Sequence, residues 1–450
     1  MSDAWKWKPS AFNVAAPANG KHLLFNSVTS ATLALNSSQQ PVLEDCLWEI
    51  EETGGCANED LLRGLATLGF VVPESEDEYL REHMKFLANR ESRDRLFLTI
   101  VPTMACNLRC TYCFQQNIPR ASAMKPAVQR GLVEFVRRKA MDSKYLVVQW
   151  FGGEPLLKHD MILALSEAFL HICDQYGMSY HAEMLTNGLL LTEQMINSLA
   201  SISIRAIQIP LDGTPATYAR RKQIPLRKAE AYYRFLVENM QSLVETTGSV
   251  TLRINVDRDN ADEAKYVVAL FKDHGVSDSR IDFRLGFLNT SRGILDCISH
   301  DCFSYTEFAD LELDFRYFLA REGYKVYGQP TPRDYPCTAA VWNSYTADPD
   351  GRIGKCVPSI GTQENTFSQI YPNDIERTVV ETSSEGPFGQ FDPFVIPACR
   401  GCPLLPACLG SCPKMHAPGH TLVCSMKEGL GEMLAFYHEY HSHGRASLRA

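Results

Sequence analysis

Residues 96–102 read LFLTIVP, and residues 106–113 read CNLRCTYC. The apolar run predicts a buried strand, and the cysteine-rich stretch after it predicts a loop at the carboxyl end of that strand. Spacings of four and three residues let Cys106, Cys110 and Cys113 converge on one site. Iron-sulfur clusters ordinarily take four cysteine ligands, so three cysteines leave one iron open to a small chelating molecule. A zinc site is the alternative, although zinc favours CxxC pairs closed by a fourth local Cys or His.

Beyond this segment, apolar runs alternate with amphipathic stretches. Further strands are predicted at YLVVQWF, HAEMLTNG, AIQIPLDG, VTLRINVD and DFRLGFL, and helices near residues 126–140, 161–176, 229–244 and 261–274. Six strands separated by helices predict an α/β fold with a parallel sheet, open or partly closed into a (β/α)6 TIM-like barrel. In such folds the chemistry lies at the carboxyl ends of the strands, which is where the motifs of this chain fall.

The chain has 450 residues, which is enough for more than one domain. A single hydrophobic core stops growing with chain length before that length is reached. Residues 1–92 are predicted to form a small N-terminal module, with a hairpin at 22–35 and helices near 43–52, 59–68 and 75–89. Residues 93–326 are predicted to form the barrel. Residues 327–450, after a helix near 305–322, form a cysteine-, proline- and glycine-rich tail in which little regular structure is predictable.

Composition narrows the class of protein. Hydrophobic residues make up 45% and charged residues 22%, as in ordinary globular proteins. A net charge of -9, without runs of lysine or arginine, argues against a nucleic-acid partner. The apolar stretches are too short for a membrane span and the N-terminus has no secretory h-region, so we expect a cytoplasmic protein.

Fifteen cysteines are many for such a protein. A disulfide framework is not expected in a reducing compartment, so the cysteines indicate metal binding or catalysis. Ten of them fall into two tight patterns, one in the CNLRCTYC loop and one in the tail. The scattered ones are Cys46, Cys56, Cys173, Cys297 and Cys302.

CNLRCTYCF resembles the signature of radical S-adenosylmethionine (SAM) enzymes. The resemblance implies a 4Fe-4S cluster whose open iron is chelated by the amino and carboxylate groups of the methionine moiety of SAM. It also implies that the cluster reduces SAM by one electron, which yields a carbon radical able to remove an unactivated C–H hydrogen. By the same resemblance Tyr112 lies against the adenine, and packing of the loop is its alternative role.

Three further segments are similar to the family in the same order: FGGEP (151–155), LTNG (185–188) and LDG (211–213). The resemblance implies that the two glycines let the backbone approach the cofactor and that the glutamate accepts a hydrogen bond from its ammonium. Plain strand-end turns are the alternative for the last two segments. The cofactor-binding residues implied here are Gly152, Gly153, Glu154, Thr186 and Asn187.

The chain also departs from the family pattern. Pro210 stands where relatives usually carry Ser, and Tyr218 and Ala219 replace a His-Asp pair that precedes an arginine. The ligand of the cofactor carboxylate is therefore open. The candidates are Arg220, Arg221 and Lys222, of which we favour Arg221, with Arg253 and Asn255 on the fifth predicted strand as second candidates that have a structural alternative.

Seven cysteines of the tail form the pattern Cys337-x13-Gly351-x4-Cys356, Cys399-x2-Cys402-x5-Cys408-x3-Cys412 and Cys424. A zinc ribbon is one interpretation. The complete spacing resembles the SPASM extension of peptide-modifying radical enzymes, which holds two auxiliary 4Fe-4S clusters. The resemblance implies one closed site of Cys399, Cys402, Cys408 and Cys424, and a second site shared by Cys337, Cys356 and Cys412.

The second auxiliary site is one thiolate short of full ligation. Relatives with a fully ligated cluster place an extra cysteine a few residues before the first, where this chain has residues 331–336. Cys297 and Cys302 are the nearest remaining thiols, and their alternative is to be buried and free. Without such a ligand one auxiliary iron is open, and a substrate thiolate would be able to bind it.

The resemblance implies a maturase that abstracts a hydrogen from a ribosomally synthesised precursor peptide and installs a thioether or carbon-carbon crosslink. Its cofactors would be three 4Fe-4S clusters and SAM, and its partners the precursor peptide and a one-electron donor such as flavodoxin or ferredoxin. The N-terminal module resembles winged-helix elements that hold leader peptides by adding a strand to a sheet edge. A structural cap is its alternative.

Two other functions remain open at this point. A sulfatase-maturing enzyme that generates formylglycine would carry an aspartate directly after the second cysteine of the auxiliary motif, where Val357 follows Cys356. An electron carrier with several clusters would need neither the GGEP segment nor a module that binds a leader peptide.

Overall fold

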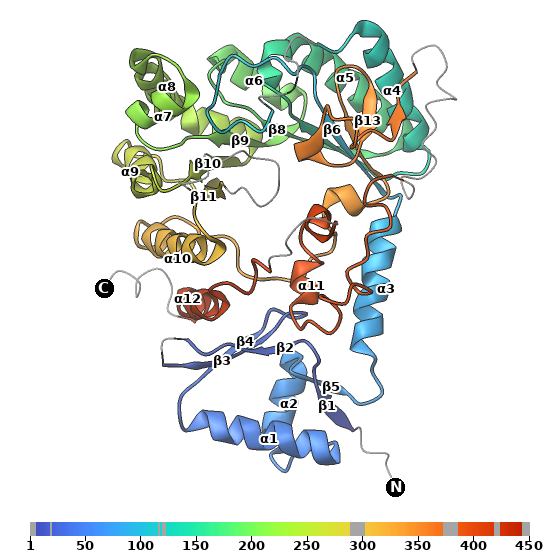
Figure 1. The fold of residues 1–450 in the computed structure, drawn as a ribbon, viewed down its shortest axis with the longest axis vertical. Coiled ribbons are helices and arrows are strands. Elements are labelled where there is room, and N and C mark those ends of the chain that lie inside the picture. Colours follow the sequence, from blue (N-terminus) through green and yellow to red (C-terminus); the bar gives the residue numbers. More distant parts are fainter. Residues whose placement is uncertain are drawn as a thin grey trace.

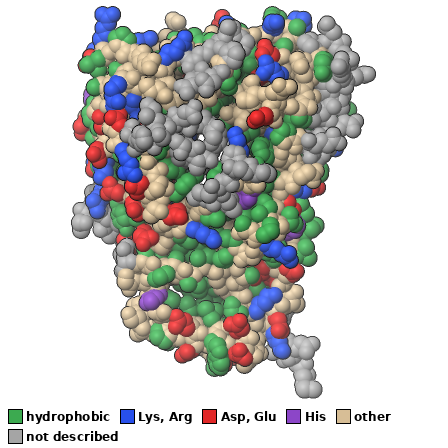
Figure 2. Space-filling view, viewed as in Figure 1, with side chains coloured by type: hydrophobic (Ala, Val, Ile, Leu, Met, Phe, Trp, Pro, Cys, Tyr) green, Lys and Arg blue, Asp and Glu red, His purple; other side chains and the backbone are tan. Residues whose placement is uncertain are grey.

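The computed structural model describes residues 6–18, 20–115, 118, 123–288, 302–371, 386–417 and 424–442. Cys297 lies outside these residues. Every helix in the described part of the chain is too short or too polar to cross a membrane. Figure 2 shows acidic and basic side chains interspersed over one face of the molecule.

A nine-stranded sheet forms the centre of the upper part of the molecule (Figure 1). Six neighbouring strands are parallel and follow one another in chain order, as the predicted (β/α)6 barrel requires. The predicted α/β fold is therefore confirmed. These strands are β6 (Arg95–Ile100), β7 (Tyr145–Trp150), β8 (Ser179–Leu185), β9 (Ile204–Pro210), β10 (Val250–Val256) and β11 (Ile281–Phe287).

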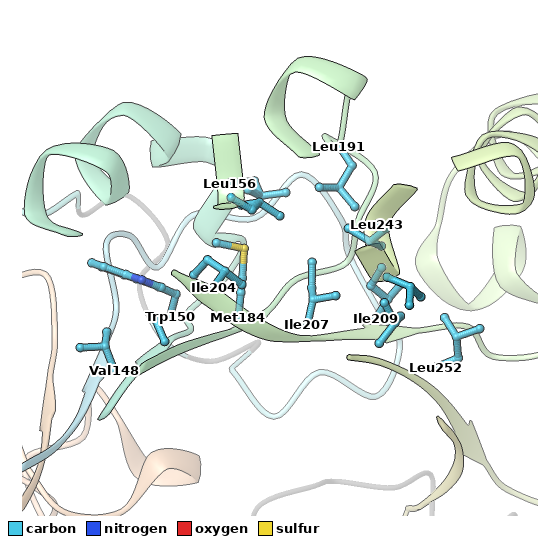
Figure 3. Close-up of a cluster of buried hydrophobic side chains, with 14 of the residues drawn as sticks. Val148, Trp150, Leu156, Met184, Leu191, Ile204, Ile207, Ile209, Leu243 and Leu252 are labelled. Atoms are coloured by element: carbon cyan, nitrogen blue, oxygen red, sulfur yellow. The ribbon is translucent and has the colours of Figure 1, made fainter. Parts of the chain in front are cut away.

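Helices cover the outer face of this sheet (Figure 1). Alternate strand residues point toward them, as Met184 and Ile207 do in Figure 3, where Leu156 and Leu191 lie above the strands. In β7 the residues that face the helices, Leu146, Val148 and Trp150, are fully buried, while those between them are only half-buried. The covering helices are α4 (Pro126–Ala140), α5 (His159–Tyr176), α6 (Glu193–Ser201), α7 (Pro215–Lys222), α8 (Leu226–Thr247) and α9 (Ala264–Asp273).

The N-terminal residues form two small sheets with helices. The predicted hairpin is present as β3 (His22–Asn26) and β4 (Thr32–Leu35), with β2 (Asn13–Ala15) on the other side of β3. The helices α1 (Gln39–Thr53) and α2 (Glu59–Leu68) follow, and β1 (Trp7–Pro9) pairs with β5 (Val71–Pro73). The third helix, α3 (Glu78–Glu91), runs from these elements along the side of the molecule toward β6 (Figure 1).

This N-terminal part packs against the tail. An apolar cluster joins Leu23 and Phe25 of β3 to Leu404 and to Leu434 of α12 (Leu430–Ser442). On α3, Tyr79 donates a hydrogen bond to the carbonyl of Phe394, and the ring of His83 stacks on Phe394 with centroids 4.8 Å apart. The two ends of the chain are thus held together by buried apolar contacts.

The tail contains more regular structure than its sequence predicts. β12 (Ser344–Ala347) pairs in parallel with β6, and β13 (Arg352–Gly354) and β14 (Ser368–Gln369) extend the sheet in antiparallel fashion. α10 (Tyr305–Arg321) leads into this region, and α11 (Leu405–Cys408) lies within it. Strands of two to four residues are too short to produce a hydrophobic period, so only their partners in space stabilise them.

Two scattered cysteines form a disulfide, contrary to the expectation from compartment alone. Cys46 faces the apolar cluster of the N-terminal part from α1, and the chain returns at Cys56 with the two Cα atoms 5.5 Å apart. That separation lies in the range that a disulfide requires. Cys302 is also disulfide-bonded, so it is neither a free thiol nor a cluster ligand.

Asn343 anchors the tail to the barrel. Its Nδ2 donates to the carbonyls of Arg93 and Arg95 at 3.1 and 3.2 Å and to Oγ of Ser143 at 3.2 Å. We expect Asn343→Ala to lower the free energy of unfolding by about 1–3 kcal/mol, because three hydrogen bonds to partly or fully buried acceptors are lost. Urea unfolding followed by tryptophan fluorescence measures this change.

The control is Asn197→Ala, which makes the same substitution at an exposed position on α6. It should change the free energy of unfolding by less than about 0.5 kcal/mol. Equal effects of both substitutions would contradict the anchoring role of Asn343.

Candidate functional site

The CNLRCTYC loop begins six residues after β6 and lies at the carboxyl end of the sheet. The thiols of Cys106 and Cys113 both lie within electrostatic reach of the Cys110 thiol. Burial raises the pKa of Cys110 to about 11; Lys222 lowers this pKa, whereas Asp212 and the thiols of the other two cysteines raise it. The backbone N–H of Leu108 points at Cys106 Sγ from 3.4 Å. The loop therefore gathers three sulfurs and already offers one of them a hydrogen-bond donor.

Two glycines after β7 let this strand end meet the loop. Gly152 has a φ of +132°, and a Cβ there would lie 2.6 Å from the carbonyl oxygen of Thr103. A Cβ on Gly153 would collide with the carbonyl oxygens of Met104 and Ala105. The glycines are thus required for close contact with the backbone just before Cys106.

Glu154 joins three strand ends. Its backbone N–H donates to the carbonyl of Ala105 at 2.9 Å, and its fully buried carboxylate accepts from Oγ1 of Thr186 at 2.6 Å and from the backbone N–H of Asn187 at 2.8 Å. Burial raises the pKa of Glu154 to about 7, against the lowering effect of these hydrogen bonds. One lone pair on Oε2 remains for a further donor.

Tyr112 belongs to a buried charge network that the sequence did not reveal. Its hydroxyl donates to Asp212, and the Lys222 ammonium contacts both the hydroxyl and the carboxylate, with Nζ 2.5 Å from Oδ2 of Asp212. Burial alone would raise the pKa of Asp212, but Lys222 and Arg221 hold it below its ordinary value. The sequence singled out Tyr112, Lys222 and the LDG segment separately, but gave no signal that these residues contact one another.

The predicted arginines are engaged by the protein itself. Arg221 is 4% exposed and donates to Asp257 Oδ2 at 2.7 Å, and its guanidinium lies 5.0 Å from the centre of the Tyr112 ring. Arg253 donates to Oδ1 of Asn255 at 2.9 Å. Contact of Arg221 or Arg253 with a cofactor carboxylate stays a prediction.

The tail thiols fall into two neighbourhoods. Burial and, to a smaller extent, the adjacent thiols raise the pKa of Cys399 to about 11, against the lowering effect of Lys427. That neighbourhood consists of Cys399, Cys402, Cys408 and Cys424.

The other neighbourhood contains the buried Cys356 and the half-buried Cys412, whereas Cys337 is exposed. Burial raises the pKa of Cys356, hydrogen bonds from Ser359 lower it, and the thiol of Cys412 raises it. Burial lowers the pKa of Lys355 to about 7, a change that Lys139 increases and the nearby Cys337 opposes.

Among the described residues, no three His, Cys, Asp or Glu side chains converge tightly enough to hold one metal ion.

The residues around the first loop fit a cluster with one open iron. Three thiols share one loop, and a backbone donor already points at the first of them. The side-chain Nδ2 of Asn107, within the loop, is buried without a hydrogen-bond partner. The polypeptide provides no acceptor for this buried donor. Such an unpaired donor is expected beside a cluster and its ligand.

The glycine contacts predict a specific defect. We expect Gly153→Ala to displace residues 104–105 and to reduce iron bound at the loop, because the new Cβ collides with two carbonyl oxygens. Iron analysis after anaerobic reconstitution measures the loss. Gly64→Ala is the control, since a Cβ there meets nothing within 4 Å. Equal iron in both variants would contradict the proposed contact.

The buried ion pair predicts a loss of stability. Asp212→Asn leaves the Lys222 ammonium, 1% exposed, without a counter-charge, and should cost about 3–5 kcal/mol of unfolding free energy. The double variant Asp212→Leu with Lys222→Met should recover most of this loss, because it removes both charges. Urea unfolding of the cluster-free protein provides the measurement.

Asp314→Asn is the matched control, because it breaks an exposed pair with Lys265. It should change the unfolding free energy by less than about 1 kcal/mol. A double variant as unstable as Asp212→Asn alone would argue against the ion-pair explanation.

Comparison with known proteins matches the central part of the chain to a family model. Residues 100–293 match the model of the Radical SAM superfamily. The radical SAM cyclopropyl synthase TigE of Paramaledivibacter caminithermalis is 26% identical over 166 residues, which are 33% of this chain and 34% of TigE. The GTP 3',8-cyclase of Chlorobaculum tepidum is 26% identical over 204 residues, 42% of this chain and 57% of the cyclase. The chain thus spans between a third and three fifths of the length of these curated relatives.

Two solved structures share the fold. The structure of anSMEcpe with bound AdoMet and Kp18Cys peptide has a TM-score of 0.55 at 16% identity and covers 77% of this chain and 99% of its own. Streptococcus suis SuiB bound to precursor peptide SuiA has a TM-score of 0.50 at 14% identity. This alignment covers 90% of the present chain and 95% of the SuiB chain. The match to the Radical SAM superfamily model therefore identifies residues 100–293 as a radical SAM domain.

Proposed function

We propose that the chain is a peptide maturase that removes a hydrogen from a ribosomally synthesised precursor peptide and installs a thioether or carbon-carbon crosslink. The observation that carries the proposal is the grouping of the tail thiols beside a radical SAM domain. The thiols of Cys402, Cys408 and Cys424 lie near enough to Cys399 to raise its pKa, which supports one auxiliary cluster held by these four cysteines. Cys356 and Cys412 are neighbours in the same way, as a second cluster requires.

The N-terminal part supports a peptide substrate. β4 lies at the end of the sheet order β2-β3-β4, so one of its edges has no strand partner among the described residues. An extended leader peptide can add a strand to such an edge. The solved structures with the same fold, anSMEcpe and SuiB, were each captured with a peptide, which supports the proposal by analogy of fold.

When bound, the cluster of the first loop and SAM supply a carbon radical that takes hydrogen from an unactivated C–H bond. The residues of this chain hold and shield that chemistry. Glu154 presents a lone pair where the methionine ammonium would bind, and the Asp212–Lys222 pair fixes Tyr112. A flavodoxin or ferredoxin would supply the electron, and the auxiliary sites of the tail would accept the surplus electron from the peptide.

The second candidate, formylglycine formation in a sulfatase, is favoured by the fold shared with anSMEcpe. Val357 is the residue after Cys356, so this chain has no aspartate at the position that supplies the base in those relatives. The peptide crosslink is therefore preferred.

Iron content and SAM cleavage test the proposal. The anaerobically reconstituted chain should hold about twelve irons, four in each of three cubane clusters, and should release 5'-deoxyadenosine under dithionite. Cys106→Ala should hold about eight irons and release none. A short peptide encoded beside this gene should lose two hydrogen atoms on incubation, measured by mass spectrometry.

Cys173→Ala is the control, because Cys173 lies on α5 outside both groups of thiols. It should keep twelve irons and full cleavage. About four irons in the unaltered chain would remove the auxiliary clusters from the proposal, and absence of 5'-deoxyadenosine would overturn the enzymatic function.

A further inference from the structure

The side-chain amide of Asn187 reaches from the end of β8 to the first cysteine of the loop. Its Nδ2 lies 3.8 Å from Cys106 Sγ and donates to Oδ1 of Asn107 at 2.7 Å. An amide nitrogen carries two donors, so one can serve the sulfur and the other the neighbouring amide. Asn187 is 8% exposed, which keeps water from competing for either bond.

The other polar atoms of Asn187 determine how this amide is oriented. Its Oδ1 accepts from the backbone N–H of Leu189 at 3.0 Å, so Nδ2 must face the loop. The backbone N–H donates to Glu154, and the backbone carbonyl accepts from the hydroxyl of Tyr232 at 2.7 Å. The donor is thus held against the sulfur by partners on both sides.

Asn107 supports this arrangement from within the loop. Its Oδ1 accepts from Asn187, which leaves its own Nδ2 buried without a hydrogen-bond partner. Leaving such a donor unpaired costs about 1–3 kcal/mol of stability. This cost indicates that the donor has a functional role. The backbone N–H of Leu108 and the Nδ2 of Asn187 thus place two donors at the sulfur of Cys106, while Oδ1 of Asn107 lies 3.8 Å from that sulfur and accepts from its thiol.

We infer that Asn187, oriented by Asn107, is a positioning residue that raises the reduction potential of the cluster held by Cys106, Cys110 and Cys113. Reduction adds one electron to the cluster and its thiolates. N–H donors directed at the sulfurs stabilise that added charge more than they stabilise the oxidised form. The inference rests on the proposed function, because it requires the cluster to be bound.

Potentials measured without SAM test this role. The full chain and its variants are reconstituted anaerobically and poised with dithionite, and each cluster signal is followed by EPR. Asn187→Ala should lower the equilibrium constant for reduction of one cluster about tenfold, a shift of about 59 mV to lower potential for one electron. The signal that shifts should be the one that changes on later addition of SAM. The two auxiliary clusters should keep their potentials.

A second variant separates tuning from folding. Asn107→Ala leaves the Leu189 turn and the Glu154 contact intact, so it should load all clusters and shift the same potential in the same direction. If Asn187→Ala fails to bind the cluster, the potential measured for Asn107→Ala tests the proposed role instead. The double variant should shift no further than Asn187→Ala, because both residues act through one donor. Asn239→Ala is the control, because its amide donates to the carbonyl of Phe235 on α8, and it should leave all potentials unchanged.

The outcomes are distinct. Loaded variants with unaltered potentials, or with equal shifts in all three clusters, would overturn the role of Asn187. An unaltered chain that binds no cluster at the loop would instead overturn the proposed function.

Discussion

The buried carboxylate of Glu154 is the constraint on which the site depends. Its two oxygens accept from Thr186 and Asn187, and its backbone N–H donates to Ala105, so one residue joins the ends of β6, β7 and β8. A carboxylate in this position is tolerated only because donors surround it, and burial still raises its pKa to about 7. Any rearrangement of these strand ends would leave that group buried and unpaired.

A second electrostatic contact holds the loop from the opposite side. The Asp212–Lys222 pair lies between the end of β9 and the end of α7 and binds the Tyr112 hydroxyl. The backbone N–H of Thr111 also donates to the carbonyl of Arg221 at 3.0 Å. The loop is therefore clamped between two sets of buried polar contacts before any cofactor is considered, which limits the reorganisation that binding would require.

The tail is structurally part of the barrel. β12 pairs with β6, the strand that leads into the loop. Ile360, four residues after Cys356, packs in one apolar cluster with Val101 and Met104, just before Cys106. The positions of the two cysteine-rich regions are thus coupled through a shared strand and a shared apolar contact, although more than two hundred residues separate them in the chain.

The sequence by itself determined the parallel strands, the radical SAM loop and the assignment of GGE and TNG to strand ends, because these features have local periods and fixed spacings. It did not indicate the Asp212–Lys222–Tyr112 network, the pairing of β12 with β6 or the Cys46–Cys56 disulfide. It also did not indicate that Asn187 turns its amide toward Cys106. Only the tertiary structure decided these, because each depends on side chains that become neighbours after burial, and no sequence spacing encodes such distances.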